Sequence, residues 1–230
     1  MSKNFPNLFT PVTIGKLEIR NRILSTGHDT TLPTDGTVND ALIAYHEARA
    51  KGGAGLIVVQ VAGIHDSARY TTHILMATGD ECIPGYAKLA ETVHSHGAKI
   101  FAQLFHPGRE IIESQDGSIP VAYAPSVSPS DRFHCIPRAL TRPIIREIVE
   151  GFGAGARRIE AAGIDGVEIV ASHGYLPAQF LNPHVNVRED EYGGSFDGRL
   201  RFLREIVAEI RESVGRDFVV GLRISGDEVD

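Results

Sequence analysis

Short apolar runs alternate with longer amphipathic stretches along most of the chain. The apolar runs have the length and composition of buried strands, and they lie at residues 20–26, 54–63, 99–106, 165–172 and 218–225. Ahead of them, residues 12–19 are expected to form a small hairpin that turns at Gly15 and Lys16. The pattern therefore predicts five strands of one sheet and a separate N-terminal hairpin.

The stretches between these strands carry apolar residues at helical spacing. We predict helices at residues 39–53, 85–96, 141–162 and 199–214. Asn39 and Thr141 are candidate N-caps, and Gly97 and Gly163 are expected to end two of the helices. Regular alternation of strand and helix is typical of a parallel sheet that is covered by helices.

Two architectures have such a sheet, the doubly wound domain and the (β/α)8 TIM barrel. Residues 25–36, STGHDTTLPTDG, lack the G-x-G-x-x-G of a dinucleotide-binding turn, which disfavours a Rossmann domain. The sequence thus predicts an α/β fold of TIM-barrel type in one domain spanning residues 1–230, with about five βα units present. Because a closed barrel needs eight, we expect a missing C-terminal half or completion by another chain, as in a homo-oligomer.

Composition and charge exclude several classes of protein. With 23 Lys and Arg against 29 Asp and Glu, the formal charge is −6, whereas a nucleic-acid-binding protein usually has a basic face. No apolar run approaches the roughly 18 residues of a membrane span, and the first ten residues lack the apolar core of a secretory signal. Two cysteines, Cys82 and Cys135, cannot form a four-cysteine metal site and suit a cytoplasmic protein.

Polar residues that can carry chemistry cluster at the carboxyl ends of four predicted strands. They are Ser25, Thr26 and His28; Gln103, His106 and Arg109; Ser172, His173 and Tyr175; and Arg223. In a TIM barrel the active site is built from the segments at this end of the strands. The sequence therefore predicts one site for a small-molecule substrate, assembled from all four strand ends, with no metal ligands.

Three segments carry a family resemblance. Residues 8–23 are LFTPVTIGKLEIRNRI, residues 102–109 are AQLFHPGR, and residues 165–202 contain DGVEI, HGYL, QFLNP, REDEYGGS and RLRF in that order. Together they resemble the old yellow enzyme family of FMN-dependent oxidoreductases, in the branch of 2,4-dienoyl-CoA reductase and trimethylamine dehydrogenase. The resemblance covers essentially the whole chain and implies FMN as cofactor and NADH or NADPH as electron donor. The 4Fe–4S ligands of that branch are not present in this chain.

The resemblance implies that six residues contact the flavin: Ser25, Thr26, Gly27, Ala62, Gln103 and Arg223. Arg223 would face the N1/O2 edge and Gln103 the mixed donor–acceptor edge of the ring. Asp29 stands where the amine dehydrogenases carry a flavin-linked cysteine, so noncovalent FMN is expected. The residues alone leave other interpretations open: Arg223 could pair with Glu168, Gln103 could bond to sheet-end backbone, and Ala62 could serve close packing.

The same resemblance makes Tyr175 the proton donor in alkene reduction and His173 the residue that hydrogen-bonds a substrate carbonyl, with His28 as a further substrate contact. A tyrosine with a pKa near roughly 10 keeps its proton at neutral pH, which suits the first role. Val170 departs from the family, because many of its reductases carry His or Asn there as a second donor. Oxidation of an N-methyl amine is therefore an open alternative to reduction of an activated C=C.

Two other functions remain possible from the sequence. A non-flavin barrel enzyme such as an aldolase would need a strand-end lysine, but Lys99 begins its strand. A truncated, non-catalytic fragment or binding module of a TIM-barrel enzyme is the other, and such a chain alone is expected to bind FMN weakly. Residues 107–140 are expected to shape substrate choice, and residues 190–195 are expected to form a structural turn.

Overall fold

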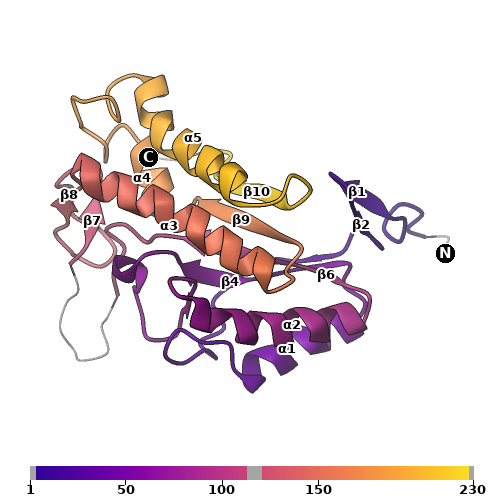
Figure 1. The fold of residues 1–230 in the computed structure, drawn as a ribbon. Helices are drawn as coiled ribbons and strands as arrows, with labels where there is room; N and C mark the ends of the chain where they lie inside the picture. Colours follow the sequence, from indigo (N-terminus) through magenta and orange to yellow (C-terminus); the bar gives the residue numbers. More distant parts are fainter. Residues whose placement is uncertain (1–3, 113–120, 228–230) are drawn as a thin grey trace.

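The structure is a computed structural model that describes residues 4–112 and 121–227. One parallel sheet runs through it (Figure 1). Its strands lie in the order β10 (Val219–Ile224), β9 (Gly166–Ala171), β6 (Lys99–Phe105), β4 (Leu56–Gly63) and β3 (Leu24–Ser25). The short strand β5 (Leu75–Met76) also pairs with β4. The four longer strands lie within the apolar runs that predicted them.

Helices cover one face of the sheet (Figure 1). They are α1 (Asp40–Lys51), α2 (Ile83–Ser95), α3 (Arg142–Ala161) and α5 (Phe196–Ser213). The structure also has three shorter helices, η1 (Asp66–Ala68), η2 (Asp80–Cys82) and α4 (Leu176–Leu181). The side chain of Asn39 accepts a 3.0 Å hydrogen bond from the Leu42 amide, which confirms it as the cap of α1. Thr141 stands at the N-cap of α3, but its side chain makes no capping bond.

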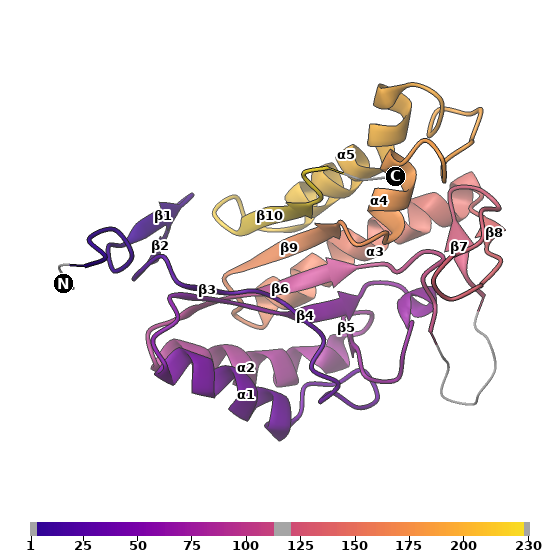
Figure 2. The same cartoon turned by 180° about the vertical axis from the view of Figure 1, so that it is seen from behind.

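Alternate residues of each strand point to opposite faces of the sheet. In β6, Ile100, Ala102 and Leu104 pack into the main core between the sheet and the helices. Phe101 and Phe105 belong instead to two smaller clusters away from that core. Figure 2 views the molecule from behind, with the strands in front of the helices. Gln103 has the same parity as the two phenylalanines and so lies on this second face.

The first predicted strand is shorter than expected. β3 has two residues instead of the seven of 20–26, because the side chains ahead of it bind the ends of other elements. Arg20 donates to the carbonyl oxygens of Ala50 and Ala54, and Asn21 donates to that of Gly53. Side chains therefore replace part of the backbone ladder in this segment.

The predicted N-terminal hairpin is confirmed, with β1 (Val12–Ile14) antiparallel to β2 (Leu17–Ile19) and Gly15 at a φ of +60°. It lies at the amino ends of the strands, whereas β7 (Tyr123–Ala124) and β8 (Arg138–Ala139) lie at the carboxyl ends (Figure 2). These two short strands belong to the segment 107–140, of which residues 113–120 lie outside the described residues.

The helix predicted at 199–214 begins three residues earlier than expected, at Phe196. Ser195 is its N-cap, because the Ser195 hydroxyl oxygen accepts a 3.1 Å hydrogen bond from the Gly198 amide. The curved parallel sheet with helices on one face confirms the predicted α/β fold of partial TIM-barrel type. The assignment of residues 1–230 to one domain stays a prediction. Within the described ranges, no helix has the length and hydropathy to cross a bilayer.

Candidate active site

A cavity of about 170 Å³ opens near the carboxyl ends of β4, β6 and β9. Its lining residues are Gly27, His28, Asp29, Val61, Gln103, Val170, His173 and Tyr175. Five of these were predicted as site residues from three different strand ends. The structure therefore brings them together in one place, as the barrel architecture requires.

A second, more open cleft of about 650 Å³ lies beside the first. It is lined by Glu168, Ser172, His173, Leu222, Arg223, Ile224 and Ser225. His173 borders both cavities, so the site extends from Tyr175 on one side to Arg223 on the other. Arg223 is thus placed at the same end of the sheet as Gln103, His173 and Tyr175.

Gln103 is held in place by its neighbour on the next strand. It is 4% exposed, lies opposite Glu168 in the β6–β9 register, and its Nε2 donates a 2.7 Å hydrogen bond to Glu168 Oε1. Gly27 passes directly over this amide, since a Cβ at Gly27 would lie 2.5 Å from Gln103 Cδ. Sheet-end backbone is not the partner of Gln103, contrary to the simplest reading of its sequence position.

Arg223 lies on β10, opposite Val170 in the β9–β10 register. Among the described residues it has no hydrogen bond and no ion pair, and Glu168, the partner that the residues alone suggested, is bonded to Gln103. The guanidinium is half-buried at the edge of the open cleft. It is therefore a fixed positive charge that no described side chain neutralises.

His173 follows β9 with a left-handed backbone, at a φ of +60°. Its Nδ1 lies 2.7 Å from the hydroxyl of Ser172. Partial burial, followed by the positive charge of Arg223, holds the pKa of His173 below its ordinary value. The imidazole is therefore neutral at pH 7 and can donate or accept a hydrogen bond in the cavity.

Tyr175 stands at the N-cap of α4 and packs among aromatic rings. Its ring meets Phe105 edge to face at 5.0 Å between centroids and Tyr70 at 6.2 Å. Burial, with a smaller contribution from the charge of Asp29, raises the pKa of Tyr175 to about 12. The hydroxyl is thus protonated throughout the physiological range.

Asp29 was not foreseen as a polar group of this cavity. Its Oδ2 accepts a hydrogen bond from the Tyr70 hydroxyl. Burial away from water raises the pKa of the carboxyl to about 6, while the nearby His28 lowers that pKa to a smaller extent. Its place just after a strand end could have indicated a site residue. Tyr70 carries no such signal, because it lies 41 residues further along the chain.

Not every predicted residue lines the two cavities. Ser25 pairs with Ile57 in the sheet, and Thr26 lies beyond it with no side chain among those that line either cavity. The side chain of Ala62 is fully buried in the main core on the helix side of the sheet. The side chain of Ala62 therefore serves close packing, which was the alternative for this residue. That Ser25, Thr26 and Ala62 contact the flavin stays a prediction.

The turn at residues 190–195 is held by hydrogen bonds from neighbouring side chains. In the turn 190–195, Asp190 receives two hydrogen bonds from Arg188, while Asn186 donates to the Tyr192 carbonyl. In residues 4–112 and 121–227, no three His, Cys, Asp or Glu side chains are grouped so that they could hold a metal ion.

The chain matches a known protein family and several curated relatives. The profile described as NADH:flavin oxidoreductase / NADH oxidase family matches residues 7–230. The chain is 42% identical over 228 residues to NADH oxidase of Thermoanaerobacter brockii, which covers 98% of this chain and 35% of the relative. It is 40% identical over 231 residues to N,N-dimethylglycine/sarcosine dehydrogenase of Chromohalobacter salexigens, covering 97% and 33%. The chain thus spans about a third of the length of these two relatives.

A solved structure of morphinone reductase in complex with tetrahydroNAD superimposes on the chain with a TM-score of 0.85 at 32% identity. The match covers 95% of this chain and 64% of that protein. The likeness therefore extends over nearly all of this chain and over less than two thirds of the solved one.

Proposed function

Because the chain belongs to the NADH:flavin oxidoreductase / NADH oxidase family, we propose that it forms the flavin-facing part of an FMN-dependent oxidoreductase that takes electrons from NADH or NADPH. The observation that carries this proposal is the pair of adjoining cavities in which Gln103, His173, Tyr175 and Arg223 meet. The substrate is a small molecule that enters the same carboxyl-end site.

The side chains around the two cavities fit the ring system of FMN. Arg223 offers a guanidinium that no acceptor in residues 4–112 and 121–227 engages, which suits a ring edge that gains negative charge on reduction. Gln103 uses one amide N–H on Glu168 and keeps its other polar positions for the mixed edge of an isoalloxazine. Gly27 lets the backbone pack directly on that amide, where any Cβ would collide with Gln103 Cδ, and so helps to fix its position. Ser25, Thr26 and Ala62 complete the proposed flavin contacts.

Bound FMN would supply the two-electron carrier that receives hydride from NAD(P)H and gives it up again. Tyr175 holds a proton that it can deliver to the carbon beside the one that receives hydride. In the tautomer in which Ser172 Oγ donates to Nδ1 of His173, the Nε2 of that ring carries the proton and can donate to a substrate carbonyl. His28 also lines the cavity and can contact substrate there. Reduction of an activated C=C is the reaction that uses both groups.

Oxidation of an N-methyl amine is a second candidate, and Val170 favours it. An isopropyl group lines the cavity where a second hydrogen-bond donor would help to grip an enone oxygen. One relative at 40% identity is a dehydrogenase of N-methylated amino acids by name. Reversed hydride flow would need no second carbonyl donor.

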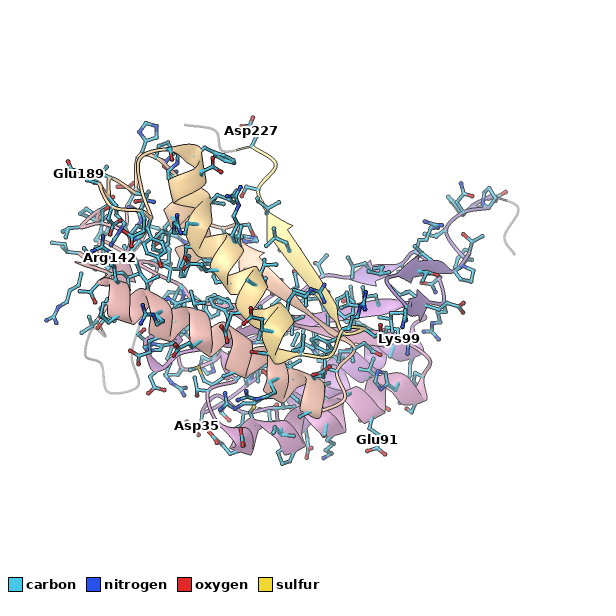
Figure 3. The ribbon with its side chains drawn as sticks, turned by 45° about the horizontal axis from the view of Figure 1, so that its top comes forward. Asp35, Glu91, Lys99, Arg142, Glu189 and Asp227 are labelled. Atoms are coloured by element: carbon cyan, nitrogen blue, oxygen red, sulfur yellow. The ribbon has the colours of Figure 1, made fainter. Side chains whose placement is uncertain are left out.

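Two other functions, a lysine-dependent aldolase and a non-catalytic binding module, differ from these in what they need from the site. A lysine-dependent aldolase would need Lys99 in the site, but Lys99 lies at the amino ends of the strands (Figure 3) with Nζ 3.4 Å from Asp165 Oδ1. A non-catalytic binding module, with a missing C-terminal half or a homo-oligomer as its complement, would share the cavities without turning over substrate.

Titration with FMN, followed by flavin fluorescence and absorbance, tests the proposal. We expect Arg223→Ala to weaken flavin binding at least tenfold, whereas Arg216→Ala, which removes an exposed charge from the turn before β10, leaves it unchanged. Equal effects of the two substitutions, or no flavin binding by the wild-type protein at any concentration tested, would reject the proposed role.

A further inference from the structure

The turn between β9 and α4 carries His173 and Tyr175, and its backbone is unusual. His173 and Gly174 follow one another in the left-handed region, at φ values of +60° and +72°. That conformation is unfavourable for a residue with a Cβ, so His173 keeps it only because surrounding bonds hold it there. The directions of the His173 and Tyr175 side chains therefore depend on what fixes the Gly174 peptide between them.

The side chain of Gln179, on α4, holds this turn. It is 2% exposed, and its Nε2 donates a 2.6 Å hydrogen bond to the carbonyl oxygen of Gly174. The backbone amide of Gln179 donates to the Tyr175 carbonyl at 2.9 Å. One residue thus binds two consecutive carbonyl groups of the turn.

The same side-chain amide ties the turn to the segment that follows β6. Its Nε2 also donates to the Pro107 carbonyl at 3.0 Å, and its Oε1 accepts the Arg109 amide at 3.3 Å. Because both carbonyl groups can only accept, the nitrogen must face them, and the orientation of the amide is settled. Gly108 packs directly on it, since a Cβ at Gly108 would overlap Gln179 Oε1. Gln179 therefore sets the ends of β6 and β9 relative to each other.

Asn186 does a similar task away from the two cavities. It is 3% exposed, its Nδ2 donates to the carbonyl oxygens of Phe180 at 2.7 Å and Tyr192 at 2.8 Å, and its Oδ1 accepts the Arg188 amide at 3.3 Å. Each side chain is thus a buried amide that donates to two backbone carbonyls. Comparing the two residues separates an effect on the site from general support of the fold.

We propose that Gln179 is a positioning residue, which sets the directions of the His173 ring and the Tyr175 hydroxyl through the Gly174 carbonyl. It lies outside the described linings of both cavities, so it acts without touching substrate or flavin. The consequence for turnover rests on the proposed function, whereas the placement of the two side chains does not require bound FMN. Because Arg223 is held on β10, loss of Gln179 should leave the affinity for FMN nearly unchanged.

Fluorine NMR of the chain labelled with meta-fluorotyrosine tests the placement, with the Tyr175 resonance assigned by its loss in Tyr175→Phe. Gln179→Met and Asn186→Leu each keep most of the side-chain volume and remove two donated hydrogen bonds, so both should lower the urea midpoint. The Tyr175 resonance should shift or split in Gln179→Met and keep its position in Asn186→Leu. Gln179→Asn keeps a polar amide but draws it back by one methylene group, and it should move the resonance if Gln179→Met does not fold.

Turnover of the flavin-loaded chain gives a second readout. Gln179→Met should lower kcat for reduction of an activated C=C at least tenfold while the Kd for FMN stays within twofold, and Asn186→Leu should change neither. Equal displacement of the Tyr175 resonance in the two variants, or displacement in neither, overturns the positioning role. A resonance displaced only by Gln179 substitutions in a chain that does not bind FMN would reject the proposed function and keep the positioning role. FMN binding and turnover with an undisturbed resonance would do the reverse.

Discussion

Gln103 Nε2 donates a 2.7 Å hydrogen bond to Glu168 Oε1 across β6 and β9, and Arg223 has no carboxylate partner among the described residues. Replacing Glu168 with alanine strands a nearly buried amide, which costs about 1–3 kcal/mol in the free energy of unfolding. Glu168→Gln keeps an acceptor oxygen and should cost less. Urea unfolding of the two variants measures the difference, and equal stabilities would mean that the bond does not hold Gln103.

Gly27 has no side chain because Gln103 occupies the space where one would lie. A Cβ there would be 2.5 Å from Gln103 Cδ, so Gly27→Ala must displace the amide that is bonded to Glu168. We expect a loss of about 1–3 kcal/mol in unfolding free energy together with weaker FMN binding. Gly226→Ala, where a Cβ meets nothing within 4 Å, is the control and should change neither quantity.

Much of this site could be predicted from the chain because parallel strands present their carboxyl ends together. Gln103 lies near the carboxyl end of an apolar run, His173 and Tyr175 follow one, and run ends are readable from sequence. Ala62 could not be placed that way. A register irregularity between Val59 and Val61 shifts the alternation of β4, so that Ala62 turns toward the helices.

The polar residues that hold the Asp29 segment in place could not be predicted from the sequence, for a different reason. Gln60 lies inside an apolar run and looks like an interruption of a strand, whereas it fixes Thr30 and hence the segment that carries Asp29. Tyr70 follows β4 in an irregular segment, and its bond to Asp29 spans 41 residues. Contacts of this kind arise only when the sheet has formed, since no periodicity encodes them.

Tyr175→Phe separates proton donation from the other steps of turnover. The substitution removes one hydroxyl and keeps the ring that packs on Phe105, so the structure should not change. For reduction of an activated C=C we expect product formation to fall by roughly 10²–10⁴ and reduction of the flavin by NAD(P)H to stay within twofold. Stopped-flow measurement of the two half-reactions tests this, and equal slowing of both would assign Tyr175 a packing role only.

Two buried histidines make the fold sensitive to acid. Burial lowers the pKa of His46 to about 4 and that of His106 to about 3, from an ordinary value of about 6.5. Below pH 6.5 the unfolded chain takes up protons that the folded chain refuses, so stability falls by up to about 1.4 kcal/mol per pH unit for each histidine. The raised pKa of Asp29 acts in the opposite sense between pH 4 and 6 and offsets part of the loss.

The two histidines differ in their partners, and this difference gives a prediction with an internal control. Neither ring nitrogen of His46 has a hydrogen-bond partner in the part of the chain that the structure describes. By contrast, His106 Nδ1 accepts the Gly108 amide at 3.0 Å, and its Nε2 lies 2.9 Å from Ser67 Oγ. His46→Phe should therefore flatten the decline of stability between pH 6.5 and 4 and raise stability at pH 8 by about 1 kcal/mol, because an unpaired buried polar group is removed. His106→Phe should flatten the decline as well but lower stability at pH 8, because it strands two polar groups. Urea unfolding at pH 8, 6 and 5 measures both effects, and a loss of stability in His46→Phe at pH 8 would contradict the absence of partners around that ring.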